Sequence, residues 1–106
     1  SSSPYGPIKA ALIHDAKGLA RQYAPKHVRV NVVSPGMVYF EGGVWNMVEK
    51  GMPDYFKQQM ARNPTGRAAT PQDIANAAVF LASPASSYTT GVNLLVDGAI
   101  SRRVNF

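Results

Sequence analysis

The spacing of apolar residues predicts a long helix over residues 4–23. Apolar side chains recur there three and four residues apart, at Ile8, Leu12, Ile13, Ala16, Leu19, Ala20 and Tyr23. Ser3 is a suitable N-cap, and Pro4 and Pro7 fall in the first turn, where a missing N–H does least harm. We expect the helix to end in the stretch APKH at 24–27.

Two segments rich in β-branched and aliphatic residues predict strands. The first is VRVNVVS at 28–34, which the turn residues SPG close at 34–36. The second is VNLLVDG at 92–98, which is typical of a short buried strand that ends in a turn.

The stretch between the strands predicts three further helices. GGVWNMVEKG at 42–51 and PDYFKQQMAR at 53–62 are typical of two short helices. The third covers 70–83, with an N-cap threonine, a proline at the first helical position and an aspartate at the third. Its apolar face consists of Ile74, Ala77, Ala78 and Leu81.

Strands that alternate with helices predict an α/β protein with a parallel sheet and crossover helices. Such a sheet needs more than two strands and a cover on both faces. Because the pattern supplies only two strands, we expect further strands of the sheet to belong to a segment outside these 106 residues.

Composition narrows the classes of function. The chain is 45% hydrophobic and 16% charged, as in a globular protein, and no apolar run reaches the length of a membrane span. Cysteine is absent, which excludes thiol chemistry and favours a cytoplasmic setting. The net charge is +5, but the basic residues are scattered, so we expect neither a nucleic-acid nor a membrane partner. His14 and His27 stand alone, so no metal site is expected.

The first helix carries a candidate proton-transfer pair. Tyr5 and Lys9 are four residues apart and so share one helix face. A nearby ammonium and the positive potential of a helix N-terminus both favour the phenolate, which lowers a tyrosine pKa from its usual value near 10. A tyrosine in this setting could exchange a proton with an alcohol or carbonyl oxygen. The same spacing also occurs in helices where both residues serve packing alone.

Four segments in a fixed order bear on that choice. YGPIKAAL, VRVNVVSPG, GRAATPQDIANAAVFLAS and TGVNLLVDGA follow one another over nearly the whole chain. Together they strongly resemble the short-chain dehydrogenase/reductase family, in the branch with a Tyr-x-x-x-Lys motif. The resemblance implies the C-terminal part of a Rossmann-type, doubly wound parallel sheet with flanking helices. It also implies an NAD- or NADP-dependent oxidoreductase that interconverts a ketone or 3-oxoacyl group and a secondary alcohol.

The resemblance assigns roles to individual residues. Tyr5 would be the catalytic acid/base, and Lys9 would bind the nicotinamide ribose and lower the tyrosine pKa. Pro35, Gly36 and Val38 would line the cofactor. The segment that follows would cover the substrate, with binding residues Met37, Tyr39, Phe40, Trp45 and Phe56. These apolar side chains could equally be folding core, but as a pocket lining they suit a small apolar carbonyl or alcohol.

Three departures from the family pattern stand out. The glycine-rich turn that holds the cofactor pyrophosphate has no counterpart in these 106 residues. The catalytic serine and asparagine of the family would lie before Tyr5, outside this chain. Phe40 stands where many members carry a threonine that holds the carboxamide. We therefore expect residues 1–106 to be the C-terminal half of a single domain whose cofactor-binding N-terminal half is absent.

The resemblance leaves the choice between NAD and NADP open, because the residues that read the ribose 2′ position also lie outside the chain. It implies a homo-oligomer, either a dimer or a tetramer. The alternative function is an inactive fragment, or a non-catalytic scaffold of the same fold that oligomerises through its last helix and strand.

Overall fold

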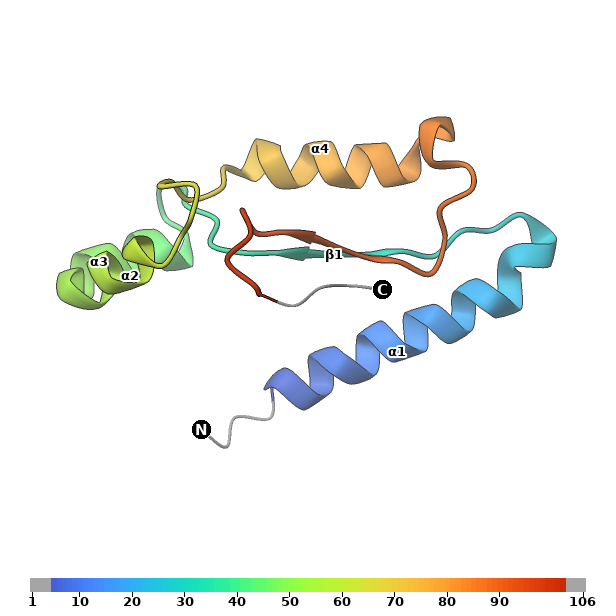
Figure 1. The fold of residues 1–106 in the computed structure, drawn as a ribbon, viewed down its shortest axis with the longest axis horizontal. Helices are drawn as coiled ribbons and strands as arrows, with labels where there is room; N and C mark the ends of the chain where they lie inside the picture. Colours follow the sequence, from blue (N-terminus) through green and yellow to red (C-terminus); the bar gives the residue numbers. More distant parts are fainter. Residues whose placement is uncertain (1–4, 103–106) are drawn as a thin grey trace. The chain divides into compact units, whose positions relative to one another are not determined.

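A computed structural model describes residues 5–102, with the side chain of Tyr5 left out. Figure 1 shows the elements, which follow the predicted order. They are α1 (Tyr5–Tyr23), η1 (Ala24–Lys26), β1 (Val32–Pro35), α2 (Val44–Gly51), α3 (Pro53–Ala61), α4 (Pro71–Ala82), η2 (Pro84–Ser86) and β2 (Asn93–Val96). All the predicted helices are confirmed to within a few residues, whereas the predicted cap at Ser3 and Pro4 lies outside the described residues.

The strands form a parallel pair. The N–H of Val32 donates to the carbonyl of Val92 at 2.9 Å, and the N–H of Gly36 donates to the carbonyl of Val96 at 3.0 Å. The residue numbers of both partners rise together, as they do in a parallel ladder. The fold is therefore α/β with a parallel sheet, as the alternating pattern predicts.

The first strand is shorter than predicted, because residues 28–31 lie outside it. Here one backbone bond, in which the N–H of Gly91 donates to the carbonyl of Val30 at 2.8 Å, is accompanied by bonds from side chains. The N–H of Val30 donates to Thr90 Oγ1 at 3.1 Å, and the Asn31 amide donates to the Thr89 carbonyl at 3.0 Å and accepts the N–H of Val92 at 3.1 Å. Extended backbone at these positions is thus held largely by polar side chains, and hydrophobic patterning does not distinguish such a segment from a strand.

The described residues divide into two compact units. Unit 1 consists of residues 5–33 and 78–94, and unit 2 consists of residues 34–77 and 95–102. In unit 1, α1 lies on one side of the strand residues and the end of α4 lies on the other (Figure 1).

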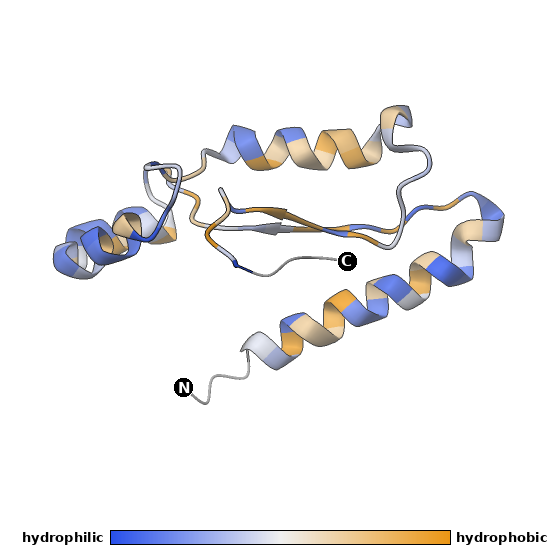
Figure 2. Ribbon diagram, in the orientation of Figure 1, coloured by the Kyte–Doolittle hydropathy of each residue, from blue (hydrophilic) through white to orange (hydrophobic). Residues whose placement is uncertain are grey.

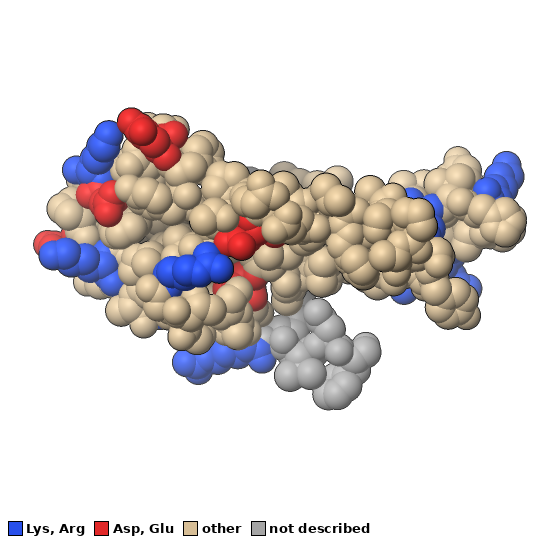
Figure 3. Space-filling view, turned by 90° about the horizontal axis from the view of Figure 1, so that it is seen from above, with Lys and Arg blue, Asp and Glu red and all other residues tan. Residues whose placement is uncertain are grey.

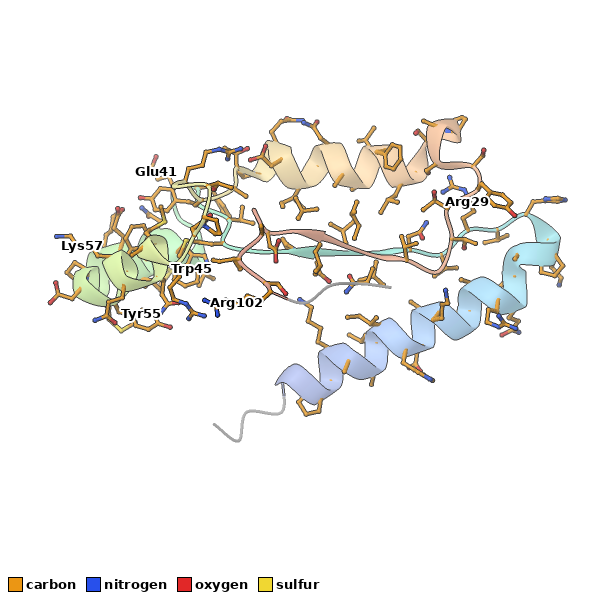
Figure 4. All side chains as sticks on the ribbon, viewed as in Figure 1. Arg29, Glu41, Trp45, Tyr55, Lys57 and Arg102 are labelled. Carbon is orange, nitrogen blue, oxygen red and sulfur yellow. The ribbon has the colours of Figure 1, made fainter. Side chains whose placement is uncertain are left out.

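Unit 1 is tied together by Arg29, which reaches from the segment after α1 to the turn after α4 (Figure 4). Its guanidinium donates to the carbonyl of Leu81 at 2.6 Å, to Ser86 Oγ at 2.9 Å, to the carbonyl of Ser83 at 3.2 Å and to that of Thr89 at 3.3 Å. A cation is also favoured at the C-terminus of a helix, where carbonyls lack intrahelical partners. Arg29 therefore closes the end of α4.

Helix α1 carries both hydrophilic and hydrophobic residues along its length (Figure 2), and its apolar face is poorly covered. Ile8 and Leu12 remain 57% and 63% exposed, and Leu19 is also exposed, while Ala20 is buried. On α4, Leu81 is buried but Ala78 is exposed, contrary to the predicted apolar face. Exposed apolar residues in such numbers are typical of surfaces that another part of a protein covers.

The start of α4 in unit 2 has the predicted capping geometry. The N–H of Asp73 donates to Thr70 Oγ1 at 3.2 Å, and the N–H of Thr70 donates to the Asp73 carboxylate at 2.9 Å. Arg67 pairs with the same carboxylate at 2.9 Å. The N–H of Thr70 and then the Arg67 guanidinium lower the pKa of Asp73 from 3.8 to about 2.

None of the helices within residues 5–102 combines the length and the apolar character needed to cross a bilayer.

Candidate functional site

The predicted catalytic pair lies at the start of α1. Tyr5 is the first residue of this helix, and Lys9 follows one turn later with its side chain half-buried. A helix N-terminus carries a partial positive charge, which favours a phenolate at its first residue. The backbone thus supports the predicted spacing of the pair, and the roles of the two side chains stay predictions.

The residues predicted to line the cofactor follow at the end of β1 in unit 2. Pro35 is exposed, and Val38 forms a parallel bridge with Ala69. Gly36 lies tightly against the residue after β2, because an added Cβ would stand 2.7 Å from Asp97 Cβ and 2.8 Å from Asp97 Cα. Two main chains can approach this closely only where a side chain is missing.

Met37 is buried, with 6% of its surface exposed. Its carbonyl accepts the N–H of Ala69 at 2.8 Å. It lines a cavity of about 230 Å³. The other lining residues are mostly polar, namely Asn63, Thr65, Arg67, Ala69, Asp73, Val96, Asp97 and Gly98. Met37 thus lies against a largely polar group of side chains.

Tyr39 and Phe56 come together in a second cavity of about 420 Å³ in unit 2. Their rings meet edge to face, with centroids 5.9 Å apart and planes at 62°. The cavity is lined by Tyr39, Glu49, Phe56, Met60, Gly66, Arg67, Ala68, Ala69 and Thr70. Two of the five predicted substrate-binding residues therefore share one cavity.

The hydroxyl of Tyr39 is engaged by α2. It donates to the carboxylate of Glu49 and accepts a hydrogen bond from the Asn46 amide at 2.9 Å. The bond to Glu49 raises the pKa of Tyr39 above 10, while the bond from Asn46 acts in the opposite direction. At neutral pH this phenol is therefore a protonated donor.

Phe40 and Trp45 lie outside the lining of that cavity. Phe40 is half-exposed and begins a tight turn in which the N–H of Gly43 donates to its carbonyl at 3.0 Å. Its ring covers Gly43, where an added Cβ would stand 2.7 Å from the ring. Trp45, labelled in Figure 4, is half-buried on α2. Phe40 thus shapes the entry into α2.

Comparison with known proteins identifies the family. The family model described as enoyl-(acyl carrier protein) reductase matches residues 1–101. The isoepoxydon dehydrogenase patN of Aspergillus clavatus is 44% identical over 96 residues, which cover 91% of this chain and 37% of that protein. The 3-oxoacyl-[acyl-carrier-protein] reductase FabG of Chlamydia muridarum is 39% identical over 92% of this chain and 37% of its own length.

The solved structures agree. A putative 2-deoxy-D-gluconate 3-dehydrogenase from Agrobacterium tumefaciens with bound NADP superimposes with a TM-score of 0.82 at 33% identity, over 93% of this chain and 39% of that one. A short-chain dehydrogenase/reductase from Brucella melitensis superimposes with a TM-score of 0.76 at 35% identity, over 92% of this chain and 37% of that one. This chain belongs to the short-chain dehydrogenase/reductase family.

Membership in the short-chain dehydrogenase/reductase family confirms the predicted fold class, which is part of a Rossmann-type α/β fold. It also makes the chain a member of a family of oxidoreductases. The chain spans 37% of the length of the first curated relatives that it matches.

The sequence pattern did not single out Asn46, Glu49 and Arg67, although the first two bond the Tyr39 hydroxyl and the last two line the cavity of about 420 Å³. Asn46 and Glu49 lie seven and ten residues after Tyr39, and no local motif links the three. Their spacing of three on a predicted helix places them on one face, which could have indicated a shared partner.

Proposed function

We propose that the intact protein is an NAD- or NADP-dependent oxidoreductase that interconverts a ketone or 3-oxoacyl group and a secondary alcohol. The observation that carries this proposal is the Tyr5–Lys9 spacing on the first two turns of α1, in a chain that belongs to the short-chain dehydrogenase/reductases. The names of the relatives support it, since they include a 3-oxoacyl reductase, a galactitol dehydrogenase and a sorbose reductase.

In this proposal residues 1–106 are the C-terminal half of one domain. The share of the relatives that the chain spans, 37%, supports it, as do the two-stranded sheet and the exposed apolar face of α1. A preceding half would provide the glycine-rich turn, the remaining strands, and the catalytic serine and asparagine.

Tyr5 would protonate the developing alkoxide during reduction and take the proton back during oxidation. Lys9 would hold the nicotinamide ribose and keep the tyrosine pKa low through its charge. Pro35, Gly36 and Val38 would border the nicotinamide, which supplies the hydride when it is bound. The donor set fits such a cofactor, because the ammonium of a lysine one turn from a helix N-terminus suits a ribose hydroxyl.

For the substrate we propose a small carbonyl or alcohol with an apolar group beside the reacting carbon. Phe56, Met60 and Ala68 give the cavity of about 420 Å³ an apolar wall. An apolar substituent gains about 0.8 kcal/mol for each methylene that it buries against such a wall.

The direct test is turnover by variants of the intact protein. Tyr5→Phe should lower kcat by several orders of magnitude with little change in cofactor affinity, because the phenol acts only in the transition state. Lys9→Ala should also weaken cofactor binding. Tyr88→Phe is the control, since Tyr88 is fully exposed and should leave both parameters unchanged. Near-normal turnover by Tyr5→Phe would contradict the assignment.

The half-domain proposal has a test of its own. The isolated 106-residue chain should not bind NADH or NADPH measurably, because it lacks the turn that would hold the pyrophosphate. Nicotinamide fluorescence in a titration measures this binding. Micromolar affinity of the isolated chain would show that residues 1–106 hold the cofactor without a preceding half.

The second candidate is a non-catalytic scaffold of the same fold. The exposed apolar side chains of α1 fit it as well, because they would be covered in an assembly as they would be in a longer domain. Cofactor binding by the intact protein separates the two, since a scaffold needs no nucleotide.

A further inference from the structure

Tyr39 lies where several segments of unit 2 meet. Its backbone N–H donates to the carbonyl of Ala69 at 2.9 Å, and the N–H of Ala69 donates to the carbonyl of Met37 at 2.8 Å. Together with the bridge between Val38 and Ala69, these bonds join the segment after β1 to the loop before α4. The backbone of Tyr39 is therefore held independently of α2 and α3.

The side chain of Tyr39 links the segment after β1 to α2. Its hydroxyl donates to Glu49 and accepts from Asn46, so both the donor and an acceptor site of the phenol are in use. Asn46 is 7% exposed, and its own carbonyl oxygen accepts the N–H of Gly42 at 3.2 Å. Tyr39 and Glu49 are half-buried, and each group in this partly buried network has a partner, which is what a stable polar cluster requires.

The ring of Tyr39 links the same segment to α3 through its edge-to-face contact with Phe56. The two helices have eight and nine residues, which is too short for stability in isolation. They are joined through Met52, whose N–H donates to the carbonyl of Val48 at 2.7 Å and whose carbonyl accepts the N–H of Phe56 at 2.9 Å. The α2–α3 pair is thus one small body that needs an external anchor.

We propose that Tyr39 is a positioning residue that anchors the α2–α3 pair through Glu49 and Asn46, and that its hydroxyl is not available to bind substrate. This replaces the predicted role of Tyr39 as a substrate-binding residue. Because Tyr39, Glu49 and Phe56 all line the cavity of about 420 Å³, the anchor also sets the shape of that cavity.

The test is hydrogen exchange of the α2 amides in the intact protein. Tyr39→Phe keeps the ring but removes the hydroxyl, and Glu49→Leu removes its acceptor; each should speed α2 exchange about tenfold. Glu49→Gln should stay near wild type, because the amide oxygen still accepts. Tyr55→Phe is the matched control, since Tyr55 is an exposed tyrosine on α3 (Figure 4).

The double variant separates an anchor from two unrelated contacts. Tyr39→Phe combined with Glu49→Leu should exchange no faster than the more affected single variant, because both remove the same bond. Additive effects, or unchanged α2 exchange in Tyr39→Phe, would overturn the proposal. Exchange is measured without turnover, so this result stands or falls separately from the proposed function.

A kinetic comparison sharpens the result and rests on the proposed function. If Tyr39 positions the helix pair, Tyr39→Phe and Glu49→Leu should both raise KM, Tyr39→Phe at least as much because it also loses the bond from Asn46, whereas Glu49→Gln should keep KM near that of the wild type. A phenol that bound substrate directly would instead raise KM in Tyr39→Phe alone, with α2 exchange unchanged, and this outcome too would overturn the proposal.

Discussion

The two units are held together by side chains that reach over very different distances along the chain. In unit 1, the bonds of Arg29 and Asn31 join residues 52 to 61 positions apart. In unit 2, Tyr39 bonds partners seven and ten positions away, and Asn63 bonds partners two and four positions away. Unit 1 therefore depends on distant segments, and the side-chain network of unit 2 is local.

This difference has a physical consequence. Bringing two distant segments together requires a large loss of chain entropy before any bond forms, whereas a local network forms within one turn or loop. Acidic and basic side chains are interspersed at the end of unit 2 that carries α2 and α3 (Figure 3), so these short helices present a charged surface to water. Substitutions in the long-range network of unit 1 should therefore have the larger effect on stability.

The largest effect is expected for Arg29→Ala. Removing the guanidinium leaves three carbonyls and the hydroxyl of buried Ser86 without this donor, which should lower the free energy of unfolding by about 3 kcal/mol. Urea unfolding of the intact protein measures it. Arg21→Ala is the control, because Arg21 is an exposed arginine on α1. An equal loss in both variants would mean that Arg29 acts only through its charge.

A somewhat smaller loss of stability is expected for Gly36→Ala, which tests a close backbone contact in unit 2. The new Cβ would overlap Asp97, and since the nearest atoms include backbone, the strain should cost about 2 kcal/mol. Gly18→Ala is the matched control, because no atom lies within 4 Å of its added Cβ and a helical alanine is more stable than glycine by about 1 kcal/mol. Thermal unfolding should therefore shift in opposite directions in the two variants.

The smallest effect concerns the capping box of α4. Thr70→Ala should lower the free energy of unfolding by about 1 kcal/mol.

The folded state lowers the pKa of Asp73, so its contribution to stability is present above pH 3.8 and is lost as the pH falls to about 2. Asp73→Asn should flatten the acid limb of the stability profile over this range. A limb that stays unchanged in Asp73→Asn would assign the acid sensitivity to other carboxylates.

Prediction from sequence succeeded best where the relevant bonds are short in sequence. The capping box at Thr70 and Asp73 closes within three residues, so its signal survives in any fold. It failed at residues 28–31, where the predicted strand is instead extended chain held largely by the side chains of Asn31 and Thr90. Hydrophobic patterning describes which face is apolar, but not whether a neighbouring strand or a side chain satisfies the backbone.

The candidate site likewise contains one part that the sequence predicted and one part that only the structure showed. The Tyr5–Lys9 spacing and the family resemblance are properties of the sequence, because four residues on a helix always return to the same face. The anchor of Tyr39 on Glu49 and Asn46 was not visible there, since α2 must first fold and turn back before these groups meet.

The sequence by itself determined the order of the elements, the capped start of α4 and the family to which the chain belongs. Periodicity and capping depend only on neighbours along the chain, so they survive without a tertiary structure. The tertiary structure alone decided the partners of Arg29, the contact that excludes a side chain at Gly36, and the choice of Tyr39 as an anchor. Each of these depends on which distant or turned-back segment comes within bonding distance, and that is set by packing.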